Sequence, residues 1–149
     1  MLIIRNANNE DFDNIYHTWK ENQKYGMSIP RKVRITERIS KKEMFIIEDK
    51  VSVGMFNLHV RSLPKEMKGY VELTCFAVDD NYKNKGYGTK ALDWIKENYK
   101  TVIICDSHKG SDNNRFYERN GFVSYGEKIV GNTPCILYKL NNTVSLFEE

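Results

Sequence analysis

The sequence predicts an α+β fold in which an antiparallel sheet leads into a strand, a glycine turn, a helix and a parallel strand. Two apolar runs between residues 44 and 60 flank a tight turn, and a third strand-like run covers residues 70–78. After Gly86-Tyr87-Gly88 the apolar spacing becomes helical. With 149 residues, 40% of them hydrophobic, the chain suits one ordinary core, so we expect a single domain over residues 1–149.

The first half of the chain is expected to contain a strand, two helices and a hairpin. Residues 1–5 predict a short strand, and Asn8 or Asn9 then caps a helix of about three turns. That helix is marked by four apolar or aromatic side chains: Phe12, Ile15, Tyr16 and Trp19. A second short helix is expected within residues 28–42. The runs MFIIE and VSVGMFNLHV, separated by Asp49 and Lys50, predict the hairpin.

The second half is expected to alternate strands and helices. The β-branched run 70–78 predicts a third strand, followed by a polar loop at 79–85. The next helix has one apolar face, formed by Ala91, Leu92, Ile95 and Tyr99. A short strand at 101–105, a helix at 112–120 that ends at Gly121, and strands at 122–129 and 135–140 complete the prediction.

Charge and cysteine content limit the function classes only mildly. The net charge of +3 is compatible with an anionic ligand but does not require one. Cys75, Cys105 and Cys135 show no CxxC spacing and suggest reduced, buried thiols, and no apolar run approaches the length of a membrane span. We therefore expect a cytoplasmic protein without membrane contact. The three histidines, His17, His59 and His108, lack metal-ligand spacing among themselves and with the cysteines, so no metal site is expected.

The glycine turn is the main candidate for ligand binding. Two glycines at the start of a helix expose backbone N–H groups, and the helix dipole adds partial positive charge, which favours phosphate. A plain loop is the simplest alternative. A dinucleotide-binding turn is another, because residues 86–91 fit GxGxxA and Asp106 lies about twenty residues further on. The polar loop before Gly86 and the short remainder of the chain argue against it.

Two segments resemble the GNAT superfamily of N-acetyltransferases. ELTCFAVDDNYKNKGYG, residues 72–88, resembles its acetyl-CoA-binding motif, in which a strand and polar loop lead to Q/R-x-x-G-x-G/A at the start of a helix. NNRFYERNGF, residues 113–122, is similar to its second motif. Lys83 replaces the usual Gln or Arg, and Gly110 and Asn113 replace a common Asn and Ala. The resemblance implies a mixed, mostly antiparallel sheet of about seven strands with about four helices and strands splayed at the cofactor site.

The resemblance also implies how acetyl-CoA is bound as co-substrate. The pantetheine arm would bond to the exposed backbone around Phe76, Ala77 and Val78, and the Phe76 N–H would polarise the thioester carbonyl. Asn113 would lie on the pantetheine side. The pyrophosphate would contact the turn, whose residues are Lys83, Asn84, Lys85, Gly86, Tyr87, Gly88 and Thr89. The two lysines could equally belong to a solvated basic loop.

Glu72 and Tyr117 are the catalytic candidates that the resemblance implies. Glu72 is the acidic residue within an apolar strand and matches the general base of the protein-acetylating branch; alternatively it faces solvent or a neighbouring strand's lysine. Tyr117 matches the tyrosine that protonates the leaving thiolate; alternatively it is a half-buried aromatic whose hydroxyl reaches water. Cys75 is more simply a packed thiol than an acyl carrier.

The expected function is N-acetyltransfer, an acyltransferase activity, from acetyl-CoA to a small-molecule or protein amine by direct transfer in a ternary complex. The alternatives are a non-catalytic CoA-binding sensor or interaction protein, and a nucleic-acid module that uses the basic segment 31–42. Glutamates at positions 37 and 43 interrupt the basic run and argue against the nucleic-acid module. No nucleic-acid partner is expected, and the protein would be a monomer or homodimer. The acceptor pocket would involve residues within about 20–42, 59–70 and 127–134, where no pattern identifies the amine.

Overall fold

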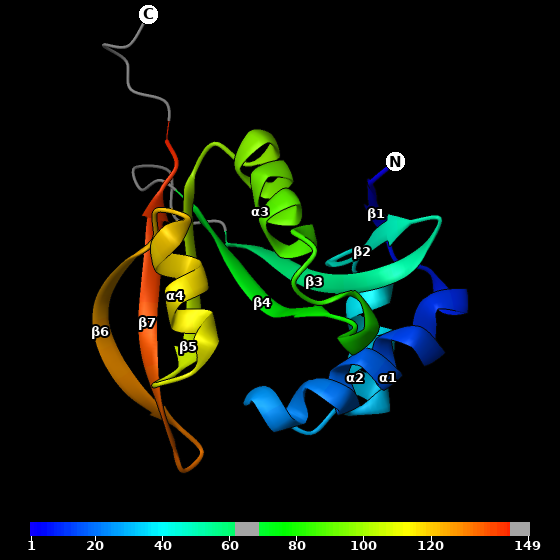
Figure 1. Ribbon diagram of the computed structural model, residues 1–149, viewed down its shortest axis with the longest axis horizontal. Coiled ribbons are helices and arrows are strands. Elements are labelled where there is room, and N and C mark those ends of the chain that lie inside the picture. Colours follow the sequence, from blue (N-terminus) through cyan, green and yellow to red (C-terminus); the bar gives the residue numbers. More distant parts are fainter. Residues whose placement is uncertain (62–68, 144–149) are drawn as a thin grey trace, which may run out of the picture. The chain divides into compact units, whose positions relative to one another are not determined.

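The structure, a computed structural model, describes residues 1–61 and 69–143 (Figure 1). It has the α+β architecture that the sequence predicts. The strands are β1 (Ile3–Asn6), β2 (Met44–Asp49), β3 (Val51–Arg61), β4 (Tyr70–Val78), β5 (Val102–His108), β6 (Val123–Val130) and β7 (Thr133–Asn141). The helices are α1 (Phe12–Glu21), α2 (Lys32–Ser40), α3 (Tyr87–Asn98) and α4 (Asp112–Arg119). The first strand begins two residues and ends one residue later than predicted, and the second helix lies within the predicted segment.

The strands form one sheet in the order β1-β2-β3-β4-β5-β7-β6. The β1–β2, β2–β3, β5–β7 and β6–β7 pairs are antiparallel, whereas β4 and β5 run parallel. In the parallel ladder, Tyr70–Glu72 face Val102–Ile104. β4 continues beyond this ladder to Val78, and this second half of β4 is where the sequence predicts the cofactor strand.

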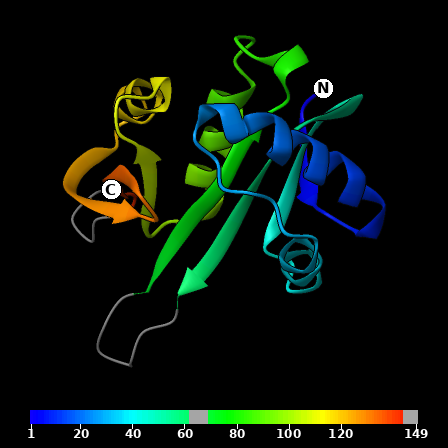
Figure 2. The same ribbon diagram turned by 90° about the horizontal axis from the view of Figure 1, so that it is seen from below.

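The chain divides into two compact units, which are described separately. Unit 1 contains residues 1–58 and 74–94. Helices α1 and α2 lie on one face of its strands and α3 on the other (Figures 1 and 2). The α1–α2 side is filled by a core that includes Ile15, Trp19, Ile35, Ile46 and Met55. On the α3 side, Trp94 contacts the stacked rings of Phe45 and Phe56.

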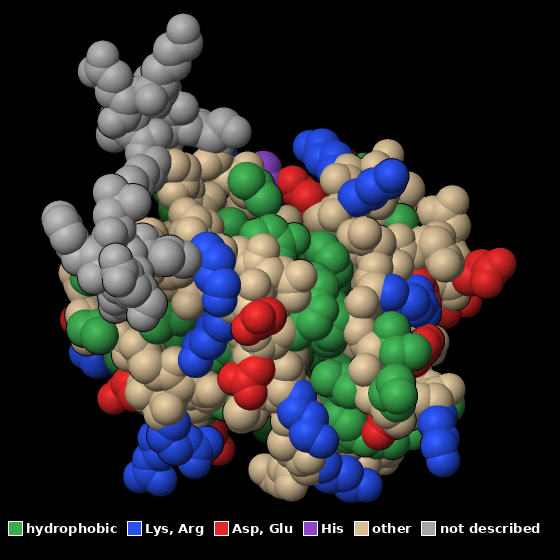
Figure 3. All heavy atoms as spheres, turned by 90° about the horizontal axis from the view of Figure 1, so that it is seen from above, with side chains coloured by type: hydrophobic (Ala, Val, Ile, Leu, Met, Phe, Trp, Pro, Cys, Tyr) green, Lys and Arg blue, Asp and Glu red, His purple; other side chains and the backbone are tan. Residues whose placement is uncertain are grey.

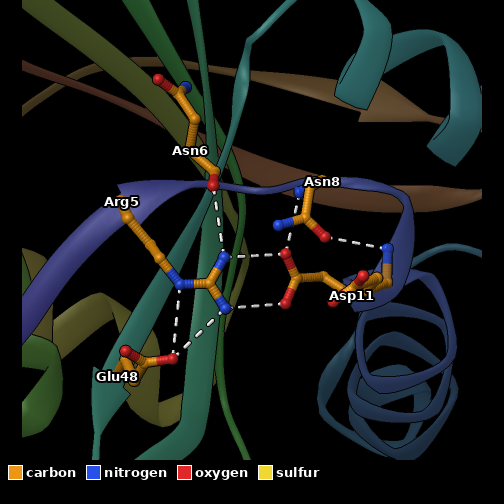
Figure 4. Close-up of polar contacts among 6 residues, drawn as sticks. Arg5, Asn6, Asn8, Asp11 and Glu48 are labelled. Carbon is orange, nitrogen blue, oxygen red and sulfur yellow. Dashed lines mark hydrogen bonds and ion pairs between the residues drawn. The ribbon is translucent and has the colours of Figure 1, made fainter.

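A partly buried ion-pair network fixes the start of α1 against β1 and β2 (Figure 4). Arg5 donates to both oxygens of Asp11, each at 2.8 Å, and also contacts Glu48 Oε1 at 3.3 Å. Asn8 and Asp11 form a reciprocal capping box, in which the Asn8 N–H donates to Asp11 Oδ2 at 2.8 Å. Hydrogen bonding from Arg5 lowers the pKa of the Asp11 carboxyl. The helix therefore begins at a fixed position on the sheet.

Unit 2 contains residues 59–73 and 95–149, of which 59–61, 69–73 and 95–143 are described. Its strands β5, β7 and β6 are covered by α4 (Figure 1). Tyr117 of α4 is the central contact, because its ring packs against those of Phe116, Phe122 and Tyr138. Along β6 every residue is exposed, and Gly126 interrupts its register with β7.

The surface shows no block of a single charge on the face drawn in Figure 3, where described basic and acidic side chains are interspersed. Among the residues that the structure describes, no helix is both long and apolar enough to cross a bilayer.

Candidate active site

The strand that leads into the glycine turn carries a local irregularity at Cys75. This residue has a φ of 52°, a left-handed conformation that is costly for a side chain with a Cβ. A left-handed residue within a strand changes the direction of the peptide that follows it. The following peptide contains the Phe76 N–H, the group expected to polarise a thioester carbonyl. The Phe76 side chain itself stacks on Phe56, with ring centroids 5.9 Å apart, so it serves the core.

Cys75 itself is a packed thiol, although it is only partly buried. Its Sγ accepts a hydrogen bond from Arg38 Nη1 at 2.7 Å, and the side chain packs against the α1–α2 core. Burial raises the pKa of the Cys75 thiol, which disfavours the nucleophilic thiolate. Cys105 and Cys135 are buried free thiols, as the sequence predicts.

β3 and β4 approach closely just before the turn, and Gly54 permits this approach. A Cβ on Gly54 would lie 2.6 Å from the carbonyl oxygen of Ala77 and 3.2 Å from the Cα of Val78. The Asp79 N–H then donates to the carbonyl oxygen of Val53 at 2.8 Å. Ala77 is buried in the α1–α2 core, so only its backbone could contact a ligand. The requirement for glycine at position 54 was not recognised from the sequence.

The turn alternates residues of positive and negative φ immediately before α3. Asn84 has a φ of 63° and Gly86 a φ of 83°, while Lys85 between them has a negative φ. Such alternation can turn successive N–H groups towards one side, which creates an anion-binding concavity. The Lys90 N–H donates to Gly86 O at 3.1 Å, which leaves the amides of Tyr87, Gly88 and Thr89 without intrahelical acceptors. The geometry therefore suits a phosphate group.

The two lysines of the turn differ in their surroundings. Lys83 Nζ donates to Asn22 Oδ1 at 3.0 Å and lies 4.6 Å from the ring centre of Tyr25. Burial lowers the pKa of Lys83. Lys83 thus ties the turn to the end of α1, a role that neither the phosphate-attraction nor the solvated-loop interpretation anticipated. Lys85 is exposed, with Nζ 5.7 Å from the ring centre of Tyr82.

Tyr87 anchors the other end of the turn to the hairpin. Its hydroxyl donates to Asp49 Oδ2 at 2.6 Å, and this hydrogen bond lowers the pKa of Asp49. The Tyr87 ring also meets that of Tyr82 edge-on, with centroids 6.4 Å apart. Since the side chain is engaged in these contacts, a ligand contact at Tyr87 would come from its backbone.

In unit 2, Glu72 forms an ion pair with a basic residue of a neighbouring strand, which is the kind of contact considered above as the alternative to a catalytic role. Arg61 of β3 donates through Nε to Glu72 Oε1 at 2.6 Å, and the Glu72 side chain is 27% exposed. The ion pair holds the carboxylate at a defined position while leaving it accessible. A role as general base is compatible with this geometry and stays a prediction.

Tyr117 is fully enclosed by unit 2 and is not a half-buried aromatic. It is 6% exposed, and its hydroxyl interacts with the Cys105 thiol of β5. Burial raises the pKa of Tyr117 well above its ordinary value, so the hydroxyl is protonated at neutral pH. It therefore holds the proton that a general acid must supply.

Asn113 is exposed on the first turn of α4, whereas its neighbour Asn114 organises the loop before that helix. Asn114 Nδ2 donates to Ser107 Oγ at 3.0 Å and to His108 O at 3.1 Å, and its Oδ1 accepts from the Gly110 N–H at 2.8 Å. In the sequence, the signal for this loop-organising role of Asn114 was its position inside the second motif.

The predicted site residues therefore divide between the two units. The cofactor candidates other than Asn113 form one segment of unit 1, from Phe76 through the turn to Thr89. Glu72, Asn113 and Tyr117 belong to unit 2. Of the segments expected to line the acceptor pocket, residues 62–68 lie outside the described residues.

Comparisons with known proteins agree with this architecture. The structure is similar to an acetyltransferase of the GNAT family from Streptococcus agalactiae, with a TM-score of 0.77, 15% identity, and coverage of 93% of this chain and 94% of that chain. It is also similar to yncA from Salmonella typhimurium, solved with its cofactor acetyl-CoA, with a TM-score of 0.75, 13% identity, and coverage of 100% and 98%. A third similar structure is the ribosomal-protein-S18-alanine N-acetyltransferase from Escherichia coli, with a TM-score of 0.75, 13% identity, and coverage of 100% of this chain and 99% of that chain.

At these identities the structural similarities establish the fold. A comparison with curated protein sequences finds no significant match. The sequence model of the acetyltransferase (GNAT) domain matches residues 40–124, which include the β2–β3 hairpin, β4, the turn and α4. The chain belongs to the GNAT acetyltransferase family.

Proposed function

We propose that the protein is an N-acetyltransferase that transfers the acetyl group of acetyl-CoA to a primary amine within a ternary complex. The observation that carries this proposal is the turn at Asn84–Gly86, where left-handed residues and unpaired amides meet the start of α3. Family membership supports acyl transfer, and the similar yncA protein was solved with acetyl-CoA. The E. coli enzyme of the same fold is named for acetylation of an alanine amine.

The residues of unit 1 would bind the coenzyme. The amides of the turn would hold the diphosphate, with Lys85 adding an exposed positive charge. The backbone of Phe76–Val78 would accept the pantetheine arm as an added strand does. In this arrangement the Phe76 N–H would stabilise the negative charge that develops on the thioester oxygen.

The residues of unit 2 would move the protons. A lysine-like amine with a pKa near 10.4 costs on the order of 4–5 kcal/mol to deprotonate at pH 7, so a base is useful. Glu72, positioned by Arg61, would accept this proton directly or through water. Tyr117, which is protonated at neutral pH, would donate a proton to the leaving thiolate. No covalent acyl-enzyme is required.

The compartment and partners follow from the same chemistry. Three free thiols fit a reducing environment, and we infer a cytoplasmic protein on that ground. The acceptor is a small-molecule or protein amine, and the protein acts as a monomer or homodimer.

A panel of amines with acetyl-CoA tests the proposal. We expect thiol release to exceed the hydrolytic background with at least one class among N-terminal peptides, lysine peptides, free amino acids, polyamines and aminoglycosides, and mass spectrometry to detect the acetylated amine. Thermal stabilisation by acetyl-CoA without turnover on any amine would favour the non-catalytic sensor. The absence of both stabilisation and turnover would refute the proposal.

A further inference from the structure

Three side chains of metal-ligand type meet on unit 1, outside the residues assigned to the proposed chemistry. His17 and Glu21 lie four residues apart on one face of α1, and Asp79 follows the end of β4. One ligand atom from each residue lies within 4.8 Å of the other two. His17 Nε2 is 3.0 Å from Glu21 Oε2. Segments about sixty residues apart in the sequence thus converge on one point.

Neighbouring backbone groups orient both carboxylates. The Asp80 N–H donates to Glu21 Oε1 at 2.6 Å, and the Asn81 N–H donates to Asp79 Oδ1 at 3.0 Å. The Glu21 bond uses the carboxylate oxygen that does not contact His17. In metal sites, hydrogen bonds of this kind fix the orientation of the ligating side chains.

The charges favour a cation at this position. The carboxylates of Glu21 and Asp79 lie close together, and surrounding groups offset their mutual repulsion in part. Those groups include Lys83, whose charge interacts with both Glu21 and Asp79, and Lys24, which is paired with Asp80. A divalent ion would bind both carboxylates and use the imidazole lone pair.

The donor set and the distances fit a transition metal. Tetrahedral zinc binds imidazole nitrogen and carboxylate oxygen at about 2.0–2.2 Å, which places its ligand atoms roughly 3.3–3.6 Å apart. Separations of up to 4.8 Å would need to close by as much as about 1.5 Å, and the 3.0 Å His17–Glu21 pair would need to open by about 0.3–0.6 Å. The His17 side chain is 69% exposed and can make this adjustment, while Glu21, 17% exposed, provides a fixed ligand.

We propose that His17, Glu21 and Asp79 form a binding site for a divalent transition metal, with Zn²⁺ as the best match, that ties α1 to the start of the turn. The sequence signal was the spacing His17-x-x-x-Glu21, which an inspection of histidines and cysteines alone misses. Asp79 could not be included from sequence, because its approach to α1 depends on the packing of unit 1.

Calorimetry with the metal alone tests this proposal on tag-free protein treated with a chelator. We expect one zinc ion per chain and a Co²⁺ derivative with visible absorption bands of nitrogen–oxygen coordination. His17→Gln and Glu21→Gln should each weaken zinc binding by at least about tenfold, the lower range seen even for outer contacts of metal sites. His108→Gln and Glu10→Gln, at other positions, should leave it unchanged.

Two results would overturn the metal site. One is the absence of saturable zinc binding by the unmodified protein. The other is equal zinc affinity in His17→Gln and His108→Gln, with circular dichroism confirming that both variants are folded. Because no acetyl-CoA or amine is present, either result would leave the proposed acetyltransfer activity untouched, and the amine panel can fail without affecting this measurement.

Discussion

Replacing Tyr117 by Phe removes one hydroxyl from the centre of unit 2 and keeps the ring that packs against Phe116, Phe122 and Tyr138. The hydroxyl interacts with Cys105, a weak hydrogen-bonding partner. Loss of such a contact should change the free energy of unfolding by no more than about 1 kcal/mol. The fold should therefore survive the substitution.

The catalytic effect should be much larger than the effect on stability. A positioned general acid contributes about 10²–10⁴ to a rate, which corresponds to about 3–5 kcal/mol of transition-state stabilisation. We expect kcat to decrease by a factor within this range. The affinity for acetyl-CoA, measured by calorimetry, should change less than about threefold, because the hydroxyl acts in the transition state and not in binding of the coenzyme.

Tyr138→Phe is the matched control. Tyr138 is also buried, its ring lies 5.7 Å from that of Tyr117, and its hydroxyl donates to Glu118 Oε2 at 2.9 Å. Burial raises the pKa of Tyr138 to about 12, so it too is protonated in the assay. If the control loses as much kcat as Tyr117→Phe, or if Tyr117→Phe retains full kcat, the assigned role is wrong.

Three further predictions concern unit 1. Asp11→Asn should lower the free energy of unfolding by about 1–3 kcal/mol at pH 7, since it removes the charged hydrogen bonds from Arg5. Because folding lowers the pKa of Asp11, the difference between the variant and the unmodified protein should shrink as the pH falls below about 4. Urea titrations at several pH values measure this difference. Gly54→Ala should cost about 1–3 kcal/mol and weaken acetyl-CoA binding, since its Cβ would meet Ala77 O at 2.6 Å. Lys85→Gln should weaken acetyl-CoA binding a few-fold and reduce its salt dependence in titrations at several ionic strengths.

Each of these predictions has its own control and contrary outcome. Asn9→Ala, beside the same cap, should show no comparable change as the pH falls below about 4. A deficit in Asp11→Asn that stays constant below about pH 4 would contradict the ion-pair account. Ser52→Ala on β3 should change the free energy of unfolding by no more than about 0.5 kcal/mol. An equally small change in Gly54→Ala would show that β4 can move to accommodate the added Cβ. For the lysine, Lys90→Gln is the control, and an unchanged salt dependence in Lys85→Gln would exclude a diphosphate contact.

The periodic patterns in the sequence predicted most of the fold, because burial imposes them directly on the chain. The two apolar runs around Asp49 and Lys50 located the hairpin, and Ile35 and Ile39, four residues apart in the sequence, are buried on α2. Helix ends were less certain: residues 28–42 were expected to contain a short helix, and the structure confines it to Lys32–Ser40.

The candidate site could be predicted only where backbone conformation depends on local sequence. Gly86 indicated the turn because glycine adopts positive φ at low cost. The left-handed conformation of Cys75 could not be predicted, since a cysteine has no such preference and tertiary contacts impose it. Likewise, the pairing of Glu72 with Arg61 depends on neighbouring strands, and the attachment of Lys83 to Asn22 depends on α1.

Calorimetry that compares acetyl-CoA with S-acetylpantetheine tests the central claim, that the turn between Lys83 and Thr89 holds a diphosphate. Both ligands carry the thioester arm, but only acetyl-CoA carries the diphosphate and its nucleoside. We expect saturable binding of acetyl-CoA at a concentration where S-acetylpantetheine gives no measurable heat. Equal affinity for the two ligands, or no heat with acetyl-CoA at millimolar concentration, would contradict the claim.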